Sequence, residues 1–270
     1  MSFLENTRKP VGLGGKLMVV MMNLGHSAVR TCQTLADGVQ GVDVQGAGLQ
    51  HDLDRVLTGS QVSVHYLIPS VPPLMHGKPR IWQLVPESEL AWHAGISFWR
   101  GATRINDTSI GIELENAGWK KSEGTRFFTP FEPAQIQALL PLAKDIIKRY
   151  NIEPQNVVAH SDIAPQRKDD PGPLFPWQSL AQQGIGAWPD ENRVAFYLNG
   201  RAPNAPASTA NLLDLLGRYG YEVKPGMTRM QQIRVIAAFQ MHFRPARWDG
   251  VADAQSQAIA EALLEKYGQG

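Results

Sequence analysis

The sequence predicts a domain of mixed strands and helices, followed by a small domain made of helices alone. Two observations carry this prediction. Between residues 62 and 159, short segments rich in β-branched and aromatic residues flank one long amphipathic helix. After residue 204, apolar residues recur at the helical period in three successive segments. The order strand, strand, strand, helix, strand fits an α/β or an α+β domain that ends near residue 185.

Four strands are predicted in the first domain. Residues 62–68 (VSVHYLI) are β-branched and aromatic, and Pro69 ends the segment because proline cannot continue a central strand. Residues 80–85 form a second short strand. Residues 109–115 (SIGIELE) alternate apolar and polar side chains, as a strand with two different faces does. Residues 156–159 then form a short strand that leads into a histidine.

The helices are predicted from apolar spacing. Residues 133–150 place isoleucine, leucine and alanine on one face, and the initial proline suits a first helical turn. Residues 184–204 hold several turn formers and indicate a domain boundary. Three helices are expected beyond it, at 210–218, 229–243 and 253–267. They form a three-helix domain over 190–270, a binding or packing module without an ionisable cluster, whereas the first domain spans 58–185.

Residues 1–57 follow no such pattern. Glycine and valine alternate around residues 38–48 without a strand or helix period. The run 17–24 is apolar and follows basic residues, but no small-residue cleavage site comes after it, so we expect no working export signal. Every apolar run is shorter than the roughly 18 residues that span a bilayer. We therefore expect an anomalous N-terminal segment and no transmembrane segment.

Composition excludes several kinds of partner and metal centre. The formal net charge is +1, so no strong field favours nucleic acid. The single cysteine, Cys32, excludes an intramolecular disulfide and a cysteine-rich metal centre. Any metal must be held by histidine and carboxylate side chains, and the 7 histidines make such a site feasible.

The segment after the fourth strand carries the clearest chemistry. His160 and Asp170 stand in a loop braced by Pro165 and by the prolines that follow Asp170. Histidine and aspartate suit zinc with a third protein ligand and an open water position. Lys168 could stabilise the oxyanion that forms when an amide is attacked. The spacing alone is equally compatible with a solvated polar loop and an ordinary surface lysine.

Glu113 is a candidate general base in the third predicted strand. It has isoleucine and leucine as neighbours, and a carboxyl group in apolar surroundings has a raised pKa. Glu115 shares its strand face, so two solvated carboxylates on an exposed face are the alternative. His93 and Asn106 stand in polar loops, which either line a substrate cleft or are surface turns.

Four segments, in this order, resemble zinc-dependent N-acetylmuramoyl-L-alanine amidases of the phage-lysozyme and peptidoglycan-recognition type. They are residues 62–68 (VSVHYLI), 91–95 (AWHAG), 106–115 (NDTSIGIELE) and 158–177 (VAHSDIAPQRKDDPGPLFPW). The resemblance covers about residues 60–270. It implies an α+β fold, a mixed sheet flanked by helices, with a helical peptidoglycan-binding-like domain. It also implies a monomer at the periplasmic side of the outer membrane that cleaves the amide between N-acetylmuramic acid and L-alanine in peptidoglycan or muropeptides.

The resemblance implies a role for each candidate residue. His160 and Asp170 would be two of three Zn²⁺ ligands. Glu113 would take the proton from the attacking water, and Lys168 would stabilise the tetrahedral intermediate. The substrate cleft would be lined by two further residues, His93 and Asn106.

The first zinc ligand is the point where the chain departs from the family. In the family a histidine ends a strand upstream of the VSVHY segment, in a His-Tyr-Thr-like motif, and no such motif is found here. The available histidines are His26 and His51, and one hypothesis is that residues 1–57 are a frame-disrupted replacement of the family's N-terminus. Besides an active zinc amidase, two alternatives therefore stay open: a non-catalytic peptidoglycan-binding protein with an incomplete zinc site, and a cytoplasmic recycling amidase.

Overall fold

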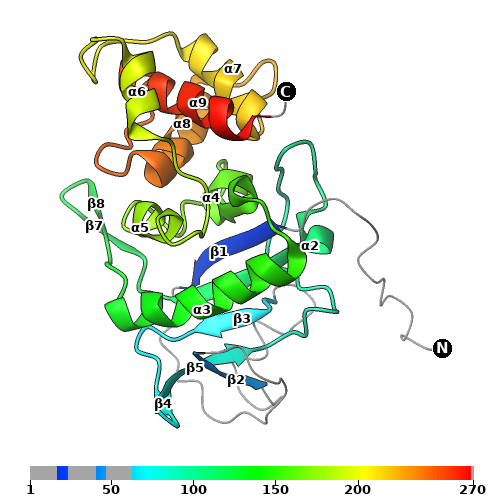
Figure 1. Cartoon of the computed structure of the whole chain (residues 1–270). Coiled ribbons are helices and arrows are strands. Elements are labelled where there is room, and N and C mark those ends of the chain that lie inside the picture. The colour runs from blue at the N-terminus through cyan, green and yellow to red at the C-terminus, as the bar shows by residue number, and fades with distance from the viewer. Residues whose placement is uncertain (1–16, 24–40, 47–62, 269–270) are drawn as a thin grey trace.

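The computed structural model describes residues 17–23, 41–46 and 63–268, and at its centre lies a mixed β-sheet (Figure 1). The described strands of the sheet run in the order β2-β5-β3-β6-β1-β9, and β4 pairs with β5. Strand β1 is parallel to β6 and β9, β3 is parallel to β6, and β3 is antiparallel to β5. The strands are β1 (Leu17–Asn23), β2 (Asp43–Gly46), β3 (Tyr66–Ile68), β4 (Leu74–Met75), β5 (Lys78–Gln83), β6 (Ser109–Glu115) and β9 (Val157–Ala159).

The two faces of the sheet carry different partners, because successive residues of a strand point to opposite faces. On one face, Ile112 of β6 shares an apolar cluster with Leu139 of α3 (Pro133–Tyr150). On the other face, Val158 of β9 shares a cluster with the helices of the C-terminal part. Glu113 follows Ile112 and therefore belongs to this second face. The mixed sheet flanked by helices confirms the predicted α+β class.

The C-terminal part contains the predicted helices and one more. The observed helices are α6 (Glu191–Leu198), α7 (Thr209–Tyr219), α8 (Arg229–Phe243) and α9 (Ala254–Tyr267). The region interpreted as a boundary thus contains α6. Some of its turn formers, such as Gly184 and Gly186, precede that helix, and others follow it at Asn199 and Gly200, which adopt the left-handed conformation. Figure 1 shows the short helices α4 (His160–Ile163) and α5 (Trp177–Ala181) between the sheet and these helices.

Residues 1–57 were expected to be an anomalous segment, and the described part of it contains two strands that the sequence did not predict. The apolar run that resembled a signal sequence is β1, which pairs with β6 on one side and β9 on the other. Strand β2 pairs with β5 in parallel. Central parallel strands read as continuous apolar runs, which explains why β1 shows no alternation. The rest of the segment, including His26 and His51, lies outside the described residues.

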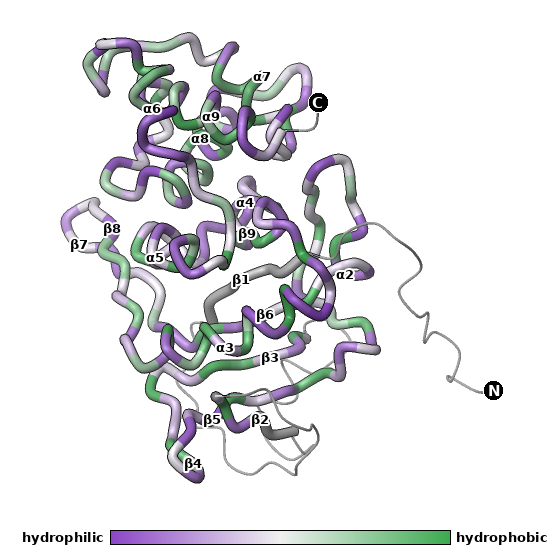
Figure 2. Tube along the Cα trace, viewed as in Figure 1, coloured by the Kyte–Doolittle hydropathy of each residue, from purple (hydrophilic) through white to green (hydrophobic). Residues whose placement is uncertain are grey.

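Smaller elements were not predicted. Besides β4, α4 and α5, these are the helix α2 (Ile105–Thr108), the 3-10 turn at Pro154–Asn156 and a hairpin of β7 (Trp119–Ser122) and β8 (Thr125–Phe128). In Figure 2, α3 alternates between hydrophobic and hydrophilic stretches along its length, as an amphipathic helix does. None of the helices in the described part is long and apolar enough to cross a membrane.

A polar cluster joins the C-terminal end of α3 to the sheet. Glu87 accepts hydrogen bonds from Tyr66 (2.7 Å), Tyr150 (2.6 Å) and the guanidinium of Arg149. Burial would raise the pKa of Glu87, but these three donors more than offset it and hold the pKa at about 2. The cluster therefore stabilises the fold through a charged group that is only 10% exposed.

Candidate active site

Three neighbouring strands bring the predicted catalytic segments together. Glu113 lies near the end of β6, and β9 ends where His160 begins α4. Strand β1 runs between them, with Met21 paired to Glu113 and Val20 paired to Ala159. The backbone of position 21 therefore stands between Glu113 and His160. Since these strands are parallel, their carboxyl ends meet at one edge of the sheet, the usual place for a site in such an arrangement.

His160 and Asp170 are brought into direct contact. The amide of Ser161 donates to the carbonyl of Asp170 at 2.9 Å, which closes the loop between them. His160 Nδ1 then lies 3.1 Å from Asp170 Oδ2, and the two residues are 5% and 9% exposed. Two ligand atoms at adjacent corners of a zinc tetrahedron are about 3.3 Å apart, given Zn–N and Zn–O distances of about 2.0–2.1 Å. The observed spacing therefore suits two ligands of one ion.

His160 and Asp170 therefore fit a zinc ion as two of its ligands. A third ligand is not identified in the described part of the chain. There, no group of three or more His, Cys, Asp or Glu residues could hold a metal ion. His160 Nε2 is buried and has no hydrogen-bond partner within the same residues. The end of β1 reads Met21-Met22-Asn23 and contains no histidine.

Glu113 has the environment that a general base needs. Its side chain is buried, and burial first, then the negative charge of Asp170, raise its pKa from 4.5 to about 8, while Lys168 acts in the opposite sense. A proton carrier works best when its pKa lies near the working pH. The alternative of two solvated carboxylates does not hold, because Glu115 is half-buried and accepts hydrogen bonds from Ser70.

Lys168 is exposed, and its charge still acts on the buried carboxyl of Glu113, whose pKa it lowers. Its amide donates to Ala164 O at 3.0 Å, which fixes the backbone of the loop. The neighbouring Arg167 was not singled out from the sequence. Its guanidinium donates to the carbonyls of Ala94 and Ile96 and ties the loop to the AWHAG segment.

His93 was expected to line a substrate cleft, but the structure buries it. Its Nε2 lies 2.7 Å from Ser109 Oγ and its Nδ1 lies 3.0 Å from Ala91 O, so neither ring nitrogen is free for a ligand. Burial, and next the charge of His65, lower its pKa well below the usual value. Asn106 is half-buried, and its Oδ1 accepts the amides of His93 (3.0 Å) and Ala94 (2.7 Å). Both residues hold the loop in shape.

Comparison with known proteins agrees with this geometry. The family model described as N-acetylmuramoyl-L-alanine amidase matches residues 23–173. The N-acetylmuramoyl-L-alanine amidase AmiD of Escherichia coli (strain K12) is 76% identical over 213 residues, which cover 79% of this chain and 77% of that protein.

Two solved structures extend the likeness to the fold. The complex of E. coli AmiD with anhydro-N-acetylmuramic acid-L-Ala-D-gamma-Glu-L-Lys has a TM-score of 0.83 and 65% identity, covering 94% of this chain and 90% of that one. AmpDh3 from Pseudomonas aeruginosa has a TM-score of 0.76 and 35% identity, covering 99% and 98%. The family resemblance predicted from the four segments is confirmed. The family model covers more than half of the chain and includes Glu113, His160 and Asp170, so this chain belongs to the N-acetylmuramoyl-L-alanine amidase family of enzymes.

Proposed function

We propose that this chain uses Zn²⁺ to hydrolyse the amide between N-acetylmuramic acid and L-alanine in peptidoglycan or muropeptides. The observation that carries the proposal is the His160–Asp170 pair, with ligand atoms 3.1 Å apart, beside the buried Glu113. The solved relatives support the substrate class. E. coli AmiD holds an anhydro-N-acetylmuramic acid peptide, and AmpDh3 was solved with an anhydromuramic pentapeptide.

Each candidate residue has its own role in the proposed reaction. Zinc, when bound by His160 and Asp170, supplies positive charge that activates a water and polarises the amide carbonyl. The carboxylate of Glu113 takes a proton from the attacking water, and the resulting acid returns a proton to the leaving amine. The ammonium of Lys168 stabilises the negative charge that develops on the carbonyl oxygen. Asn106 shapes the loop at the substrate side, and His93 acts only as its buried support.

The sequence leaves His26 and His51 as candidates for the third ligand, and a site without a third ligand is the alternative. The test is metal analysis and muropeptide hydrolysis with purified wild type and with the His26→Ala and His51→Ala variants. About one zinc per chain and release of free stem peptide are expected for the wild type. Loss of zinc in one variant identifies the ligand. Zinc binding without hydrolysis of any muropeptide would refute the assignment as an amidase.

A second function is favoured by one observation: the described residues assemble two ligands and not three. With two protein ligands zinc affinity falls, and the chain would act as a peptidoglycan-binding protein without catalysis. Sedimentation with purified cell walls, in the absence of hydrolysis and of measurable zinc, is the expected result in that case. Recovery of hydrolysis on addition of zinc alone excludes it.

On the family resemblance we also propose that the chain acts as a monomer in the periplasm at the outer membrane. Cell fractionation tests this location. Recovery in the cytosolic fraction alone would favour the recycling amidase, which acts on soluble fragments.

A further inference from the structure

The C-terminal helices hold the segment that carries the zinc-ligand pair. Asp162, two residues after His160, is fully buried. Its Oδ2 accepts the amide of Ala159 at 2.8 Å and lies 2.6 Å from Nδ1 of His242 on α8. Its Oδ1 accepts the hydroxyl of Tyr221 at 2.6 Å. Two of the three hydrogen bonds to this carboxylate therefore come from the C-terminal part of the chain, 59 and 80 residues away.

Helix α8 also contacts the segment 160–177 at two further points. The ring of His242 stacks on Trp177, the first residue of α5, with centroids 3.9 Å apart. Near the middle, the side chain of Gln166 donates to Gln231 O, and Arg234 donates to Gln166 O, both at 3.0 Å. Helix α8 thus contacts the start, the middle and the end of the segment.

These contacts bear directly on the geometry of the ligand pair. Asp162 binds the amide of Ala159, the residue before His160, so its position sets the backbone from which the imidazole projects. The next amide, of Ser161, donates to Asp170 O at 2.9 Å. A shift of Asp162 would therefore move His160 relative to Asp170. Hydrogen bonds to a buried carboxylate are short and strong, and leaving such a group without its donors is costly.

We propose that the C-terminal helical domain is a positioning element of the active site, with Asp162 as the positioning residue and Tyr221 and His242 as its anchors. The proposal goes beyond wall binding as the role of this domain. It rests on the proposed function only in that the segment it orders carries His160 and Asp170, and the order of that segment is measured without any reaction.

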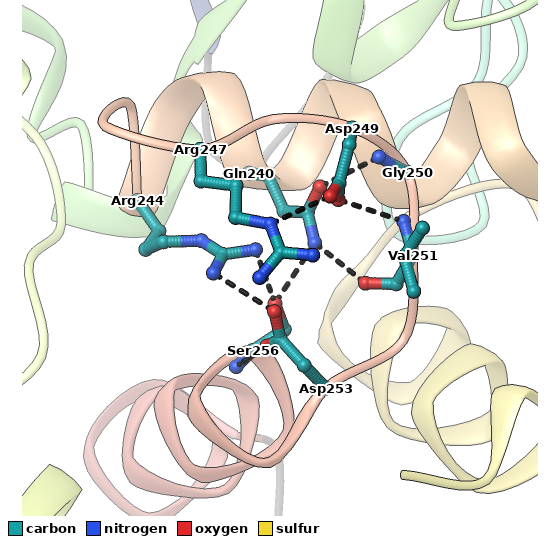
Figure 3. A network of polar contacts seen from close by, with 8 residues as sticks. All are labelled: Gln240, Arg244, Arg247, Asp249, Gly250, Val251, Asp253 and Ser256. Atoms are coloured by element: carbon teal, nitrogen blue, oxygen red, sulfur yellow. Dashed lines mark hydrogen bonds and ion pairs between the residues drawn. The ribbon is translucent and has the colours of Figure 1, made fainter. Parts of the chain in front are cut away.

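The C-terminal domain contains a matched control. Figure 3 shows that Gln240 of α8 and Arg244, the residue after α8, donate to Ser256 of α9, while Arg244 also pairs with Asp253. The contacts drawn there all lie within residues 240–256, and the bond from Gln240 to Ser256 joins α8 to α9. Ser256→Ala therefore removes buried polar contacts from the same helix without touching the segment 160–177.

The experiment is amide hydrogen exchange of residues 159–170 in metal-free protein. Loss of one buried hydrogen bond in Tyr221→Phe should speed exchange at Ser161 and Lys168 about tenfold. Ser256→Ala should leave these amides protected, after correction for global stability measured by urea unfolding. Equal exchange in the two variants would overturn the proposal.

A second pair of variants separates the hydrogen bond from packing at His242. His242→Phe keeps an aromatic ring against Trp177 but removes the donor to Asp162, whereas His242→Asn keeps a donor and removes the ring. Faster exchange in the phenylalanine variant, rescued in the asparagine variant, supports positioning through Asp162. The reverse order assigns the effect to stacking and overturns the role of the carboxylate.

Where hydrolysis is measurable, Tyr221→Phe should lower kcat and leave KM unchanged. Absence of hydrolysis in the wild type bears on the proposed function alone.

Discussion

Replacing Glu113 with glutamine should change the stability of the metal-free protein in a pH-dependent way. The pKa of this buried carboxyl is raised from 4.5 to about 8. A group with a raised folded-state pKa contributes stability that is fully present below 4.5 and is lost as the pH rises through about 8. The full rise corresponds to about 5 kcal/mol. Glutamine carries no ionisable proton, so the variant should gain stability relative to wild type across this interval, up to about that amount.

The assay is urea unfolding of both proteins with a chelator present, in buffers from below pH 4.5 to above pH 8. Because all other groups are shared, they cancel in the difference between the two free energies of unfolding. Glu115→Gln, the same substitution two residues along β6, controls for effects of the amide itself. A difference that stays constant with pH would show that Glu113 is solvated in the folded protein, and the argument for a buried base would fail.

Three further predictions follow from the structure. Glu87→Gln should lower the free energy of unfolding by up to about 3 kcal/mol at neutral pH. The lowered pKa of Glu87 gives stability that is present above pH 4.5 and lost as the pH falls through about 2. Urea unfolding in acid and neutral buffers measures this difference. Gly172→Ala should destabilise more than Gly124→Ala, since both have positive φ (81° and 83°) but only at Gly172 would a Cβ meet Phe128 at 2.6 Å; thermal unfolding of the two variants decides. Met21→His, beside Glu113 in the strand register, should restore the zinc content toward one ion per chain in whichever of the His26→Ala and His51→Ala variants has lost it, as metal analysis will show.

The elements predicted correctly from the sequence are those whose apolar pattern runs over their whole length. The strand β6 and the helices α3 and α8 have the predicted bounds, because alternation or helical spacing runs over their whole length. Strand β1 was missed because pairing with residues about a hundred positions away defines it, and periodicity does not report pairing. The helix α6 was missed because it is short and turn formers follow it directly.

The candidate site, too, was predicted only in part from the sequence. Spacing left His160 and Asp170 open between a zinc site and a solvated loop, and apolar neighbours left Glu113 open between a buried base and a solvated carboxylate. The family resemblance singled out all three residues, and the structure buries them. His93 was expected to line a substrate cleft. The sequence of a polar loop gives no sign that the imidazole ring of this residue turns inward toward Ser109. Asp162 was overlooked since its partner His242 lies 80 residues further along the chain. No short motif could have revealed that contact.

The position of β1 between β6 and β9 links the folding of this protein to the assembly of its site. In the described sheet, β9 pairs with β1 alone, and β1 joins it to β6. Until β1 is inserted, the strand before His160 has no hydrogen-bonded neighbour, and the backbones carrying Glu113 and His160 are not in register. The pairing joins residues that lie far apart in sequence, and such contacts form late because of their loop-closure cost. We therefore expect partly folded chains to have a formed α3 and a scattered site, so catalytic competence should arise in the last step of folding.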